Sequence, residues 1–424
     1  MNVDIQLERS ANEYFWDNVL SSLDSPHDSE STVDQNITPS KQTPNSIPNI
    51  GIVIDLVQDS SLKDDYLKLL RRIEPLGINL IQLNLANDFG QAVEYKSIPN
   101  IGYFQASLEH NETDKKAKSS FYNLQRLGDM VHLAHENGIR LIPEINLATN
   151  GGGWYNTGVL MDCPQTLCDK GHNIAFDVID KMESVIPIVV AAILEIWDAF
   201  SISPFQSFLH LGADERKAAI DGCFMEAGHE ASTAKSAYNR FEKTLLASLS
   251  MVGIDPNQII RWHNREKVKY PDRVGYITHY TEIDDVPKVP ESGILHAPFF
   301  GTVLLEDDTT PWDVYRDTRR WLNGPSTPQG MVIKTIGGQI PQYDHLVAFA
   351  MGLGLTAENK GSLTTSDSFH GDFELECVRF ECENAMAPFG DFTGGRIKIQ
   401  NESSTESCTD RTVNITLRKS RKFL

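Results

Sequence analysis

The chain has little cysteine, a deficit of basic residues and no long hydrophobic run. Six cysteines among 424 residues are too few for a disulfide scaffold, and their spacing matches no zinc site. No apolar run approaches the length of about 20 residues that a transmembrane helix needs, so we expect a soluble protein without membrane insertion. These absences exclude a disulfide-stapled module and a membrane-spanning protein.

Acidic residues outnumber basic ones, 58 to 38, which gives a formal net charge of −20 at pH 7. Nucleic acids and anionic membrane surfaces both reward basic patches, so this balance argues against either as a partner. The N-terminus has neither a basic start nor an apolar core and predicts no signal peptide. Sequons at Asn36, Asn111, Asn401 and Asn414 are compatible with secretion, so the residues alone leave the compartment open.

Three segments differ in composition. Residues 1–47 are predicted to be a short disordered leader and polar linker, because the Ser-, Asp-, Thr- and Pro-rich stretch cannot bury a core. Residues 48–360 alternate apolar runs of strand length with helical patterns. Residues 361–424 show strand-like alternation, as in Phe373–Val378, which predicts a small β-rich extension.

The central segment predicts an α/β fold, specifically a (β/α)8 TIM barrel. Continuous apolar strands that alternate with helices indicate a parallel sheet covered on both faces, and eight of them over roughly 300 residues match a closed barrel. An open doubly wound sheet more often has a glycine-rich turn after its first strand, which Asp55–Gln58 is not. The eight predicted strands are Gly51–Ile54, Ile78–Leu83, Ile139–Ile142, Phe208–Leu211, Ile259–Trp262, Val274–Ile277, Gly293–His296 and Met331–Lys334.

The chemistry of such a barrel lies at the C-terminal ends of its strands. Those ends carry carboxylates, amides and aromatic rings, among them Asp55, Asn146, Trp262 and Tyr280. This mixture predicts a sugar site, in which rings stack on pyranose faces and amides or acids hold hydroxyls. Histidines follow several strands without forming a clear ligand set, so we predict no metal and no other cofactor.

Two adjacent carboxylates, Asp214 and Glu215, follow the predicted strand Phe208–Leu211. Neighbouring like charges disfavour the ionised form, so few structural needs call for such a pair at a strand end. An active site that needs one protonated and one ionised carboxylate does call for it. The alternative is a solvated loop that happens to hold two acids.

Three segments, Ile142–Asn146, Gly153–Trp154 and His210–Glu215, resemble the β-N-acetylhexosaminidases of glycoside hydrolase family 20. In that family the third strand carries I-P-E-I-D and the fourth ends in H-x-G-G-D-E, where this chain has I-P-E-I-N and H-L-G-A-D-E. The likeness spans residues 48 to 360 and includes Asp55 of strand one and Asp88 after strand two.

The resemblance implies a glycosidase that removes terminal β-linked N-acetylhexosamine by a retaining, substrate-assisted mechanism. The acetamido oxygen of the sugar attacks its own anomeric carbon, while Glu215 protonates the leaving oxygen and later activates water. Asp214 holds the acetamido group and stabilises its developing charge. The partner is then a glycan or glycoconjugate with terminal N-acetylhexosamine, and the compartment is secretory or lysosomal in type.

Seven further residues are expected to contact the sugar. Trp262 either walls the acetamido cavity or caps the core, and Trp154 lies on a glycine-rich loop that either closes over substrate or is a disordered turn. Tyr343 stands where the family often has a tryptophan, and Asp344 beside it is a candidate hydroxyl contact. The remaining three are Asp88, Asn146 and Tyr280.

Several family positions are changed. The strand-one arginine aligns with Ile50, the first acid after strand two with Asn87, and the third-loop histidine with Asn150. In the family the latter two positions couple to the general acid, so their replacement bears on the tuning of Glu215. The chain thus keeps the catalytic pair and loses much of the sugar-recognition set. This pattern fits a divergent hexosaminidase or, alternatively, a non-catalytic carbohydrate-binding barrel that has lost turnover.

Overall fold

The computed structural model describes most of the barrel and three residues that follow it. These residues are 48–57, 62–87, 90–95, 122–147, 167–168, 173–174, 182–201, 207–212, 230–263, 277–286, 299–324, 328–355, 372–373 and 376. The predicted leader and four predicted site residues, Asp88, Trp154, Asp214 and Glu215, lie outside them.

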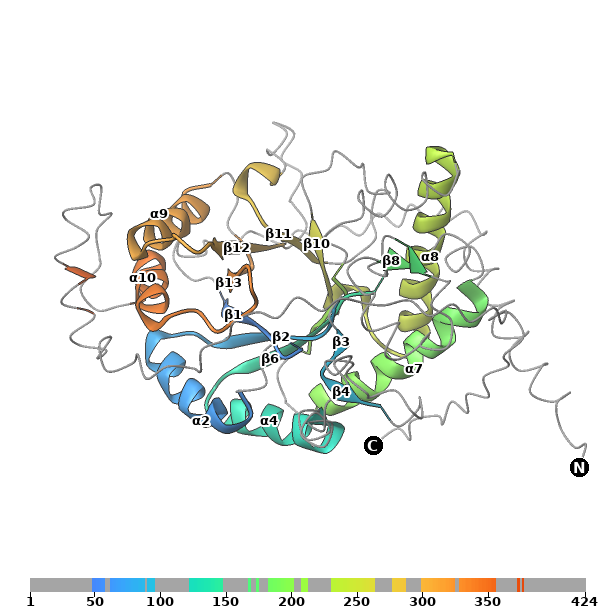
Figure 1. Ribbon diagram of the computed structural model, residues 1–424, viewed down its shortest axis with the longest axis horizontal. Coiled ribbons are helices and arrows are strands. Elements are labelled where there is room, and N and C mark those ends of the chain that lie inside the picture. The colour runs from blue at the N-terminus through green and yellow to red at the C-terminus, as the bar shows by residue number, and fades with distance from the viewer. Residues whose placement is uncertain are drawn as a thin grey trace, which may run out of the picture.

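Eight parallel strands close into a barrel, which confirms the predicted fold class (Figure 1). The order around the ring is β1-β13-β12-β11-β10-β9-β6-β2, and β1 pairs with both β13 and β2, so the ring is closed. The strands are β1 (Asn49–Asp55), β2 (Leu80–Asn87), β6 (Arg140–Ile145), β9 (Leu209–His210), β10 (Ile259–His263), β11 (Ile277–Tyr280), β12 (Phe299–Leu305) and β13 (Gly330–Thr335).

Helices surround these strands (Figure 1). They are α2 (Leu62–Ile73), α4 (Leu124–Glu136), α7 (Met182–Phe200), α8 (Ala231–Met251), α9 (Pro311–Leu322) and α10 (Tyr343–Leu353). Shorter elements are β3 (Gly90–Gln91), β4 (Val93–Glu94), β5 (Tyr122–Asn123), β7 (Leu167–Cys168), β8 (Asn173–Ile174) and the 3₁₀ turns η1 (Glu74–Leu76), η6 (Pro256–Gln258) and η7 (Ile283–Asp285). β3 pairs antiparallel with β2 and so extends that strand's hairpin beyond the ring.

Local sequence signals begin and end the helices as expected. The Asn123 side chain caps α4 by accepting from the Arg126 amide, and Gly138, with φ of 70°, follows the helix end. α9 begins with Thr310 and Asp313 in a reciprocal capping box, with a proline in its first turn. Both signals lie within a few residues of the helix ends, so they depend on local sequence alone.

The seventh predicted strand is wrong. Residues 293–296 lie outside the described part of the chain, and the strand that pairs with both β11 and β13 is Phe299–Leu305. Two short apolar runs stand close together here, and the sheet uses the longer, second one. The sixth strand extends further than predicted, because it includes His279 and Tyr280, and residues 274–276 of the prediction lie outside the described part of the chain.

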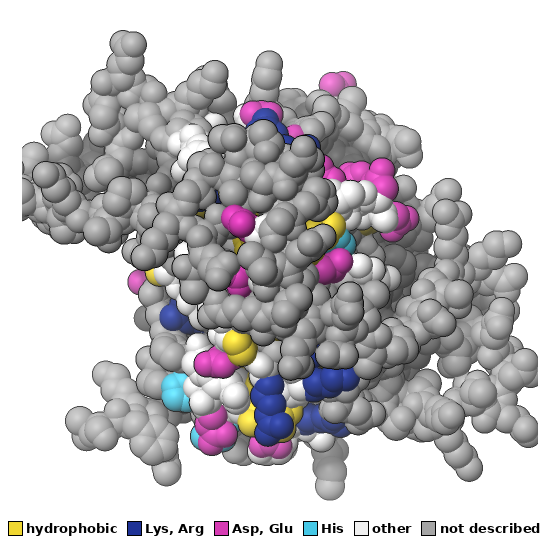
Figure 2. Space-filling model, turned by 90° about the vertical axis from the view of Figure 1, so that its left-hand side faces the viewer, with side chains coloured by type: hydrophobic (Ala, Val, Ile, Leu, Met, Phe, Trp, Pro, Cys, Tyr) yellow, Lys and Arg dark blue, Asp and Glu magenta, His cyan; other side chains and the backbone are white. Residues whose placement is uncertain are grey.

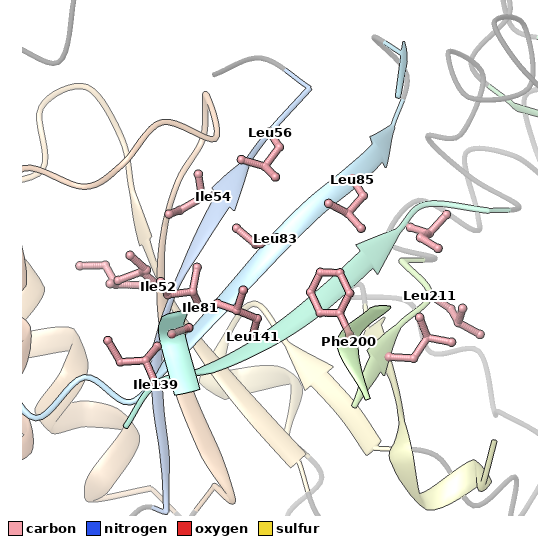
Figure 3. Packing of buried hydrophobic residues seen from close by; sticks show 14 of the residues in the cluster. Ile52, Ile54, Leu56, Ile81, Leu83, Leu85, Ile139, Leu141, Phe200 and Leu211 are labelled. Atoms are coloured by element: carbon pink, nitrogen blue, oxygen red, sulfur yellow. The ribbon is translucent and has the colours of Figure 1, made fainter. Parts of the chain in front are cut away.

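The main hydrophobic core lies between the barrel and its helices. In Figure 3, side chains from β1, β2 and β6, such as Ile54, Leu83 and Leu141, lie on the same side of neighbouring strands. Residues on one strand alternate between this outer core and the barrel interior, because successive side chains point to opposite faces. α7 is apolar around most of its circumference and contacts α4, α8 and β6.

The outer surface of the helices is charged. Figure 2 faces the side of the molecule where α9 and α10 lie, and acidic and basic side chains are interspersed among its coloured atoms. Among them, α9 carries exposed pairs between Arg316 and Asp313 and between Arg320 and Asp284 of η7. None of the described helices is both long and apolar enough to cross a bilayer.

The C-terminal segment is described at only three residues. Asp372, Phe373 and Glu376 have helical backbone, so the strand predicted for 373–378 is wrong at the described positions. The other residues of that predicted extension lie outside the described part of the chain.

Candidate active site at the C-terminal end of the barrel

Two rings of inward-facing side chains fill the barrel. One residue from each strand forms an apolar ring, and the side chain two positions further along each strand forms a polar ring above it. The apolar ring is Val53, Leu80, Ile142, Phe208, Ile260, Ile277, Phe300 and Val332. The polar ring is Asp55, Gln82, Glu144, His210, Trp262, His279, Thr302 and Lys334. The barrel interior therefore changes from apolar to polar toward the end where the strands open into loops.

Glu144 is the more deeply buried of the two carboxylates in the polar ring, with 1% of its surface exposed against 5% for Asp55. Its two oxygens accept hydrogen bonds from Gln82 Nε2 and Trp262 Nε1, each at 2.7 Å. A buried carboxylate is tolerated only when such donors replace its water. Glu144 thereby joins β2, β6 and β10.

A second set of polar contacts crosses the ring through His210 and His279. The Gly212 amide donates to His210 Nδ1 at 3.0 Å, His210 Nε2 lies 3.1 Å from His279 Nδ1, and His279 Nε2 lies 2.8 Å from Thr302 Oγ1. Burial, reinforced by nearby positive charge, holds the pKa of both rings well below the usual value for histidine. Glu144 Oε1 is 3.9 Å from His210 Nδ1, but that nitrogen accepts from Gly212, so the two groups form no ion pair.

Trp262 is packed within the polar ring. Its indole is 2% exposed, donates to Glu144 and stacks on His279 with ring centroids 3.8 Å apart. The ammonium of Lys334 lies 4.7 Å from the indole centroid. These contacts explain why Trp262 is buried in the polar ring, which we call the floor of the site. Its predicted contact with the acetamido group stays a prediction.

The chain leaves β9 through a constrained glycine. Gly212 has φ of 66°, and a Cβ at this position would lie 2.0 Å from Oδ1 of Asn146, so no larger residue fits without a shift. Asn146 is buried, with 5% of its surface exposed, and its Oδ1 has no hydrogen-bond partner among the described residues. The predicted catalytic residues Asp214 and Glu215 follow two and three positions later.

Asp55 belongs to a separate polar pair. Its Oδ2 accepts from Asn87 Nδ2 at 2.6 Å and its Oδ1 from the Val57 amide at 2.9 Å. Asn87, which aligns with a family acid, is thus a neutral donor to the strand-one carboxylate. Ile50, at the family's arginine position, packs in the outer core.

The mouth of the barrel has an amide side and an apolar side. Asn84 on β2 and Asn146 after β6 each stand two positions after a residue of the polar ring, so their side chains are expected to face inward as well. Leu304 on β12 and Ile336 after β13 do so on the other side, and they are 39% and 64% exposed. Apolar side chains at an open rim suit contact with a ligand or a covering segment.

Three other predicted residues have their described contacts away from this ring. Tyr280 follows His279 and so faces the opposite side of β11, where its ring packs edge-on against Phe299 in the outer core. Tyr343 donates to the Arg72 carbonyl on α2 at 3.3 Å, and its ring is buried in the same core. Asp344 accepts from the neighbouring His345 amide. The structure does not bring these three to Trp262 and Asn146, and their sugar contacts stay predictions.

Sequence reasoning missed Gln82, Thr302 and Lys334 as site residues. A usable signal was present, because each stands two positions after an inward apolar residue of its strand. Among the described residues, no three His, Cys, Asp or Glu side chains group as a metal site would require.

Comparison with known proteins places this geometry in a family. The catalytic-domain model of glycosyl hydrolase family 20 matches residues 51–265, half of the chain. The match runs from β1 through the segment that contains Asp214 and Glu215 to the end of β10. No curated protein matches the chain.

Solved structures share the fold at low identity. The chitobiase of Flavobacterium johnsoniae is 15% identical with a TM-score of 0.54, over 78% of this chain and 51% of that one. The Streptomyces plicatus N-acetyl-β-hexosaminidase, solved with Thio-NAglucal, is 14% identical with a TM-score of 0.53, over 79% and 68%. A further β-N-acetylhexosaminidase is 16% identical with a TM-score of 0.56, over 84% and 81%. The chain thus spans about half of the Flavobacterium protein.

Proposed function

The chain belongs to glycosyl hydrolase family 20, and we propose that it removes terminal β-linked N-acetylhexosamine from glycans by a retaining, substrate-assisted mechanism. The observation that carries the proposal is the polar ring, which forms the floor of a site directly below the strand end that leads into Asp214 and Glu215. The family match covers this motif and the ring residues from Asp55 to Trp262, whereas His279, Thr302 and Lys334 lie beyond it.

The proposed chemistry assigns a role to each carboxylate. Glu215 donates a proton to the glycosidic oxygen as the acetamido oxygen attacks the anomeric carbon, and it then takes a proton from the water that opens the oxazolinium-like ring. Asp214 orients the acetamido group and stabilises the positive charge that develops on it. Both carboxylates must face the mouth, and the turn at Gly212 supports this, because it takes the chain out of the extended conformation just before them.

The surrounding residues support recognition of a sugar. The unpartnered Oδ1 of Asn146 leaves a buried acceptor beside Gly212 that a substrate N–H or O–H could satisfy. Trp262, Tyr343, Asp344, Trp154, Asp88 and Tyr280 remain our other candidates for substrate contact. The partner we propose is a glycan or glycoconjugate that ends in N-acetylhexosamine.

Hydrolysis of an aryl β-N-acetylglucosaminide by the full chain tests this function. We expect turnover that falls by about 100-fold or more in Glu215→Gln and in Asp214→Asn. The matching aryl β-glucoside, which lacks the acetamido nucleophile, should not be hydrolysed. NMR of the first product should show the β-anomer, as retention requires.

A non-catalytic glycan-binding barrel is the second candidate, and the Asn87–Asp55 pair favours it, since a neutral amide occupies a family acid position. Under this alternative the unmodified chain binds N-acetylglucosamine-terminated glycans in calorimetry but does not cleave them. Turnover that persists undiminished in Glu215→Gln would instead leave the enzyme class standing and overturn our assignment of the acid.

A further inference from the structure

We infer that His279 is a positioning residue for the catalytic pair and acts on it through His210 and Gly212. The inference rests on the proposed function, because it assigns His279 to the same site. His279 lies in β11 and His210 in β9, and neither side chain has any exposed surface. Their strands lie on either side of β10, so His279 acts on the β9 loop across one intervening strand.

The hydrogen bonds fix the tautomer of each ring. A backbone amide can only donate, so Gly212 N–H makes His210 Nδ1 an acceptor and leaves the ring hydrogen on Nε2. That hydrogen points at His279 Nδ1, 3.1 Å away, which makes this nitrogen an acceptor too. The His279 hydrogen is then on Nε2 and donates to Thr302 Oγ1 at 2.8 Å. Each ring therefore determines which nitrogen of the next can donate.

The chain of hydrogen bonds from Thr302 through His279 and His210 ends at Gly212, which precedes Asp214 by two residues. Gly212 N–H is held by His210, and Gly212 C=O accepts from the Trp262 amide at 2.9 Å. With φ of 66°, Gly212 is also where the chain turns out of the strand, two residues before Asp214. If the hydrogen of the His210 ring were on Nδ1, two N–H donors would face each other. The hydrogen bond from Gly212 N–H to His210, which stabilises the turn, would then be lost.

The surroundings keep both rings neutral. Among the described residues, Glu144 of β6, Lys334 of β13 and Arg261 of β10 are charged groups near the pair, and the Trp262 ring stacks on His279. Lys334 and Arg261 disfavour a positive charge on His210, and burial does so for both rings. If either ring gained a proton, two N–H donors would face each other across one of these hydrogen bonds. The histidines can therefore hold Gly212 in place only while both rings are neutral.

Two variants of His279 separate its two hydrogen bonds. The amide oxygen of His279→Asn can replace Nδ1 as the acceptor for His210, whereas the amide of His279→Gln reaches the place of Nε2 and contacts Thr302 instead. Both amides are polar and close to histidine in size, so each serves as the control for the other. We expect kcat toward the aryl β-N-acetylglucosaminide to fall by about 10-fold or more in His279→Gln, with KM changed by less than about 3-fold. His279→Asn should restore most of kcat.

Hydrogen–deuterium exchange at the Gly212 amide gives a readout that needs no turnover. We expect faster exchange in His279→Gln than in His279→Asn or the unmodified chain. Equal kcat and equal exchange in the two variants would overturn the inference. If the unmodified chain has no turnover, the proposed function fails and the exchange comparison still decides the role of His279. Should His279→Gln not fold, ¹⁵N NMR of the unmodified chain decides instead: hydrogen on His210 Nδ1 overturns the inference.

Discussion

Gly212 and Gly138 have nearly the same backbone conformation, with φ of 66° and 70°, but different surroundings. A Cβ at Gly212 would lie 2.0 Å from Asn146 Oδ1, whereas one at Gly138 would meet nothing within 4 Å. Gly138→Ala therefore measures the cost of the left-handed conformation alone, about 1–2 kcal/mol. We expect Gly212→Ala to lower the free energy of unfolding in urea by a further ~1–3 kcal/mol, because the new methyl group overpacks the site.

The double variant Gly212→Ala with Asn146→Ala checks the cause of this extra loss. Removal of the amide takes away Oδ1, the atom that the new methyl group would meet first at 2.0 Å, and leaves the residue's Cα at 2.9 Å. The two substitutions should then be non-additive, with a combined loss smaller than the sum of the single ones. Additive losses would show that crowding against Asn146 is not the reason for glycine at this position.

The buried histidines predict a pH dependence of stability. Burial holds the pKa of His210 and His279 well below 6.5, so between that value and the lower folded value the unfolded chain binds more protons. The free energy of unfolding is therefore highest above pH 6.5 and falls as the pH is lowered, by up to about 1.4 kcal/mol per pH unit for each ring.

His279→Asn removes one of these two groups, so urea unfolding from about pH 7.5 to about pH 5 should show a shallower slope than the unmodified chain. The appropriate control is His132→Gln, which removes a histidine on the exposed side of α4. A slope in His279→Asn as steep as that of the unmodified chain would mean that His279 does not titrate in this way.

Between elements, the most buried ion pair in the described part of the chain joins the barrel to a helix. Arg261 of β10 and Glu242 of α8 lie 2.6 Å apart, with 5% and 9% of their side chains exposed. β10 also carries Trp262 into the polar ring, so this pair helps to fix the position of that strand in the ring. Burial of two charges is unfavourable by itself, and each depends on the other for compensation.

Loss of one partner from this pair should be costly, whereas loss of both should not. We expect Glu242→Leu to reduce the free energy of unfolding by about 3–5 kcal/mol, because the buried Arg261 loses the carboxylate that lies 2.6 Å away, and the double variant with Arg261→Met to recover most of it. Asp284→Asn is a matched control, since Asp284 and Arg320 are 2.7 Å apart but exposed, and its effect should stay below about 1 kcal/mol. Thermal and urea unfolding would contradict the argument if the buried and exposed variants lost equal stability.

At the level of elements, periodicity predicted most of the barrel. Continuous apolar runs placed β1, β2 and β13. The seventh strand was misplaced because two apolar runs are separated only by Ala297 and Pro298, and only pairing with β11 and β13 selects the second. Which run enters a sheet depends on contacts that are distant in sequence.

The site was predictable only in part, for a related reason. Strand ends and the Asp214–Glu215 motif could be read from the chain, and so could the inward facing of His210. Period-two alternation would also have sent Tyr280 away from His279. In contrast, nothing local to Tyr343 shows that its hydroxyl reaches the Arg72 carbonyl, because that contact depends on how α10 packs against α2.

For the whole molecule, closure of the barrel is what aligns the rings. β1 is the closing strand, since it pairs with β13 on one side and β2 on the other. Gly51 of β1 stands opposite Leu80 of β2, and a Cβ there would lie 2.4 Å from the Leu80 side chain and 2.8 Å from its carbonyl oxygen. The backbone oxygen cannot move aside without shifting the β1–β2 pairing.

Gly51→Ala should therefore weaken the entire barrel rather than one strand. We expect a loss of about 1–3 kcal/mol in the free energy of unfolding, with the midpoint seen by tryptophan fluorescence and the midpoint seen by far-ultraviolet circular dichroism lowered together. Six tryptophans contribute to the fluorescence, among them Trp262 in the barrel interior, and the circular dichroism signal reports mainly the helices. Coincident midpoints therefore mean that helices and barrel lose structure as one unit. A helical signal that keeps its midpoint while the fluorescence midpoint falls would show that the helices hold without a closed barrel, and closure would then stabilise the site alone.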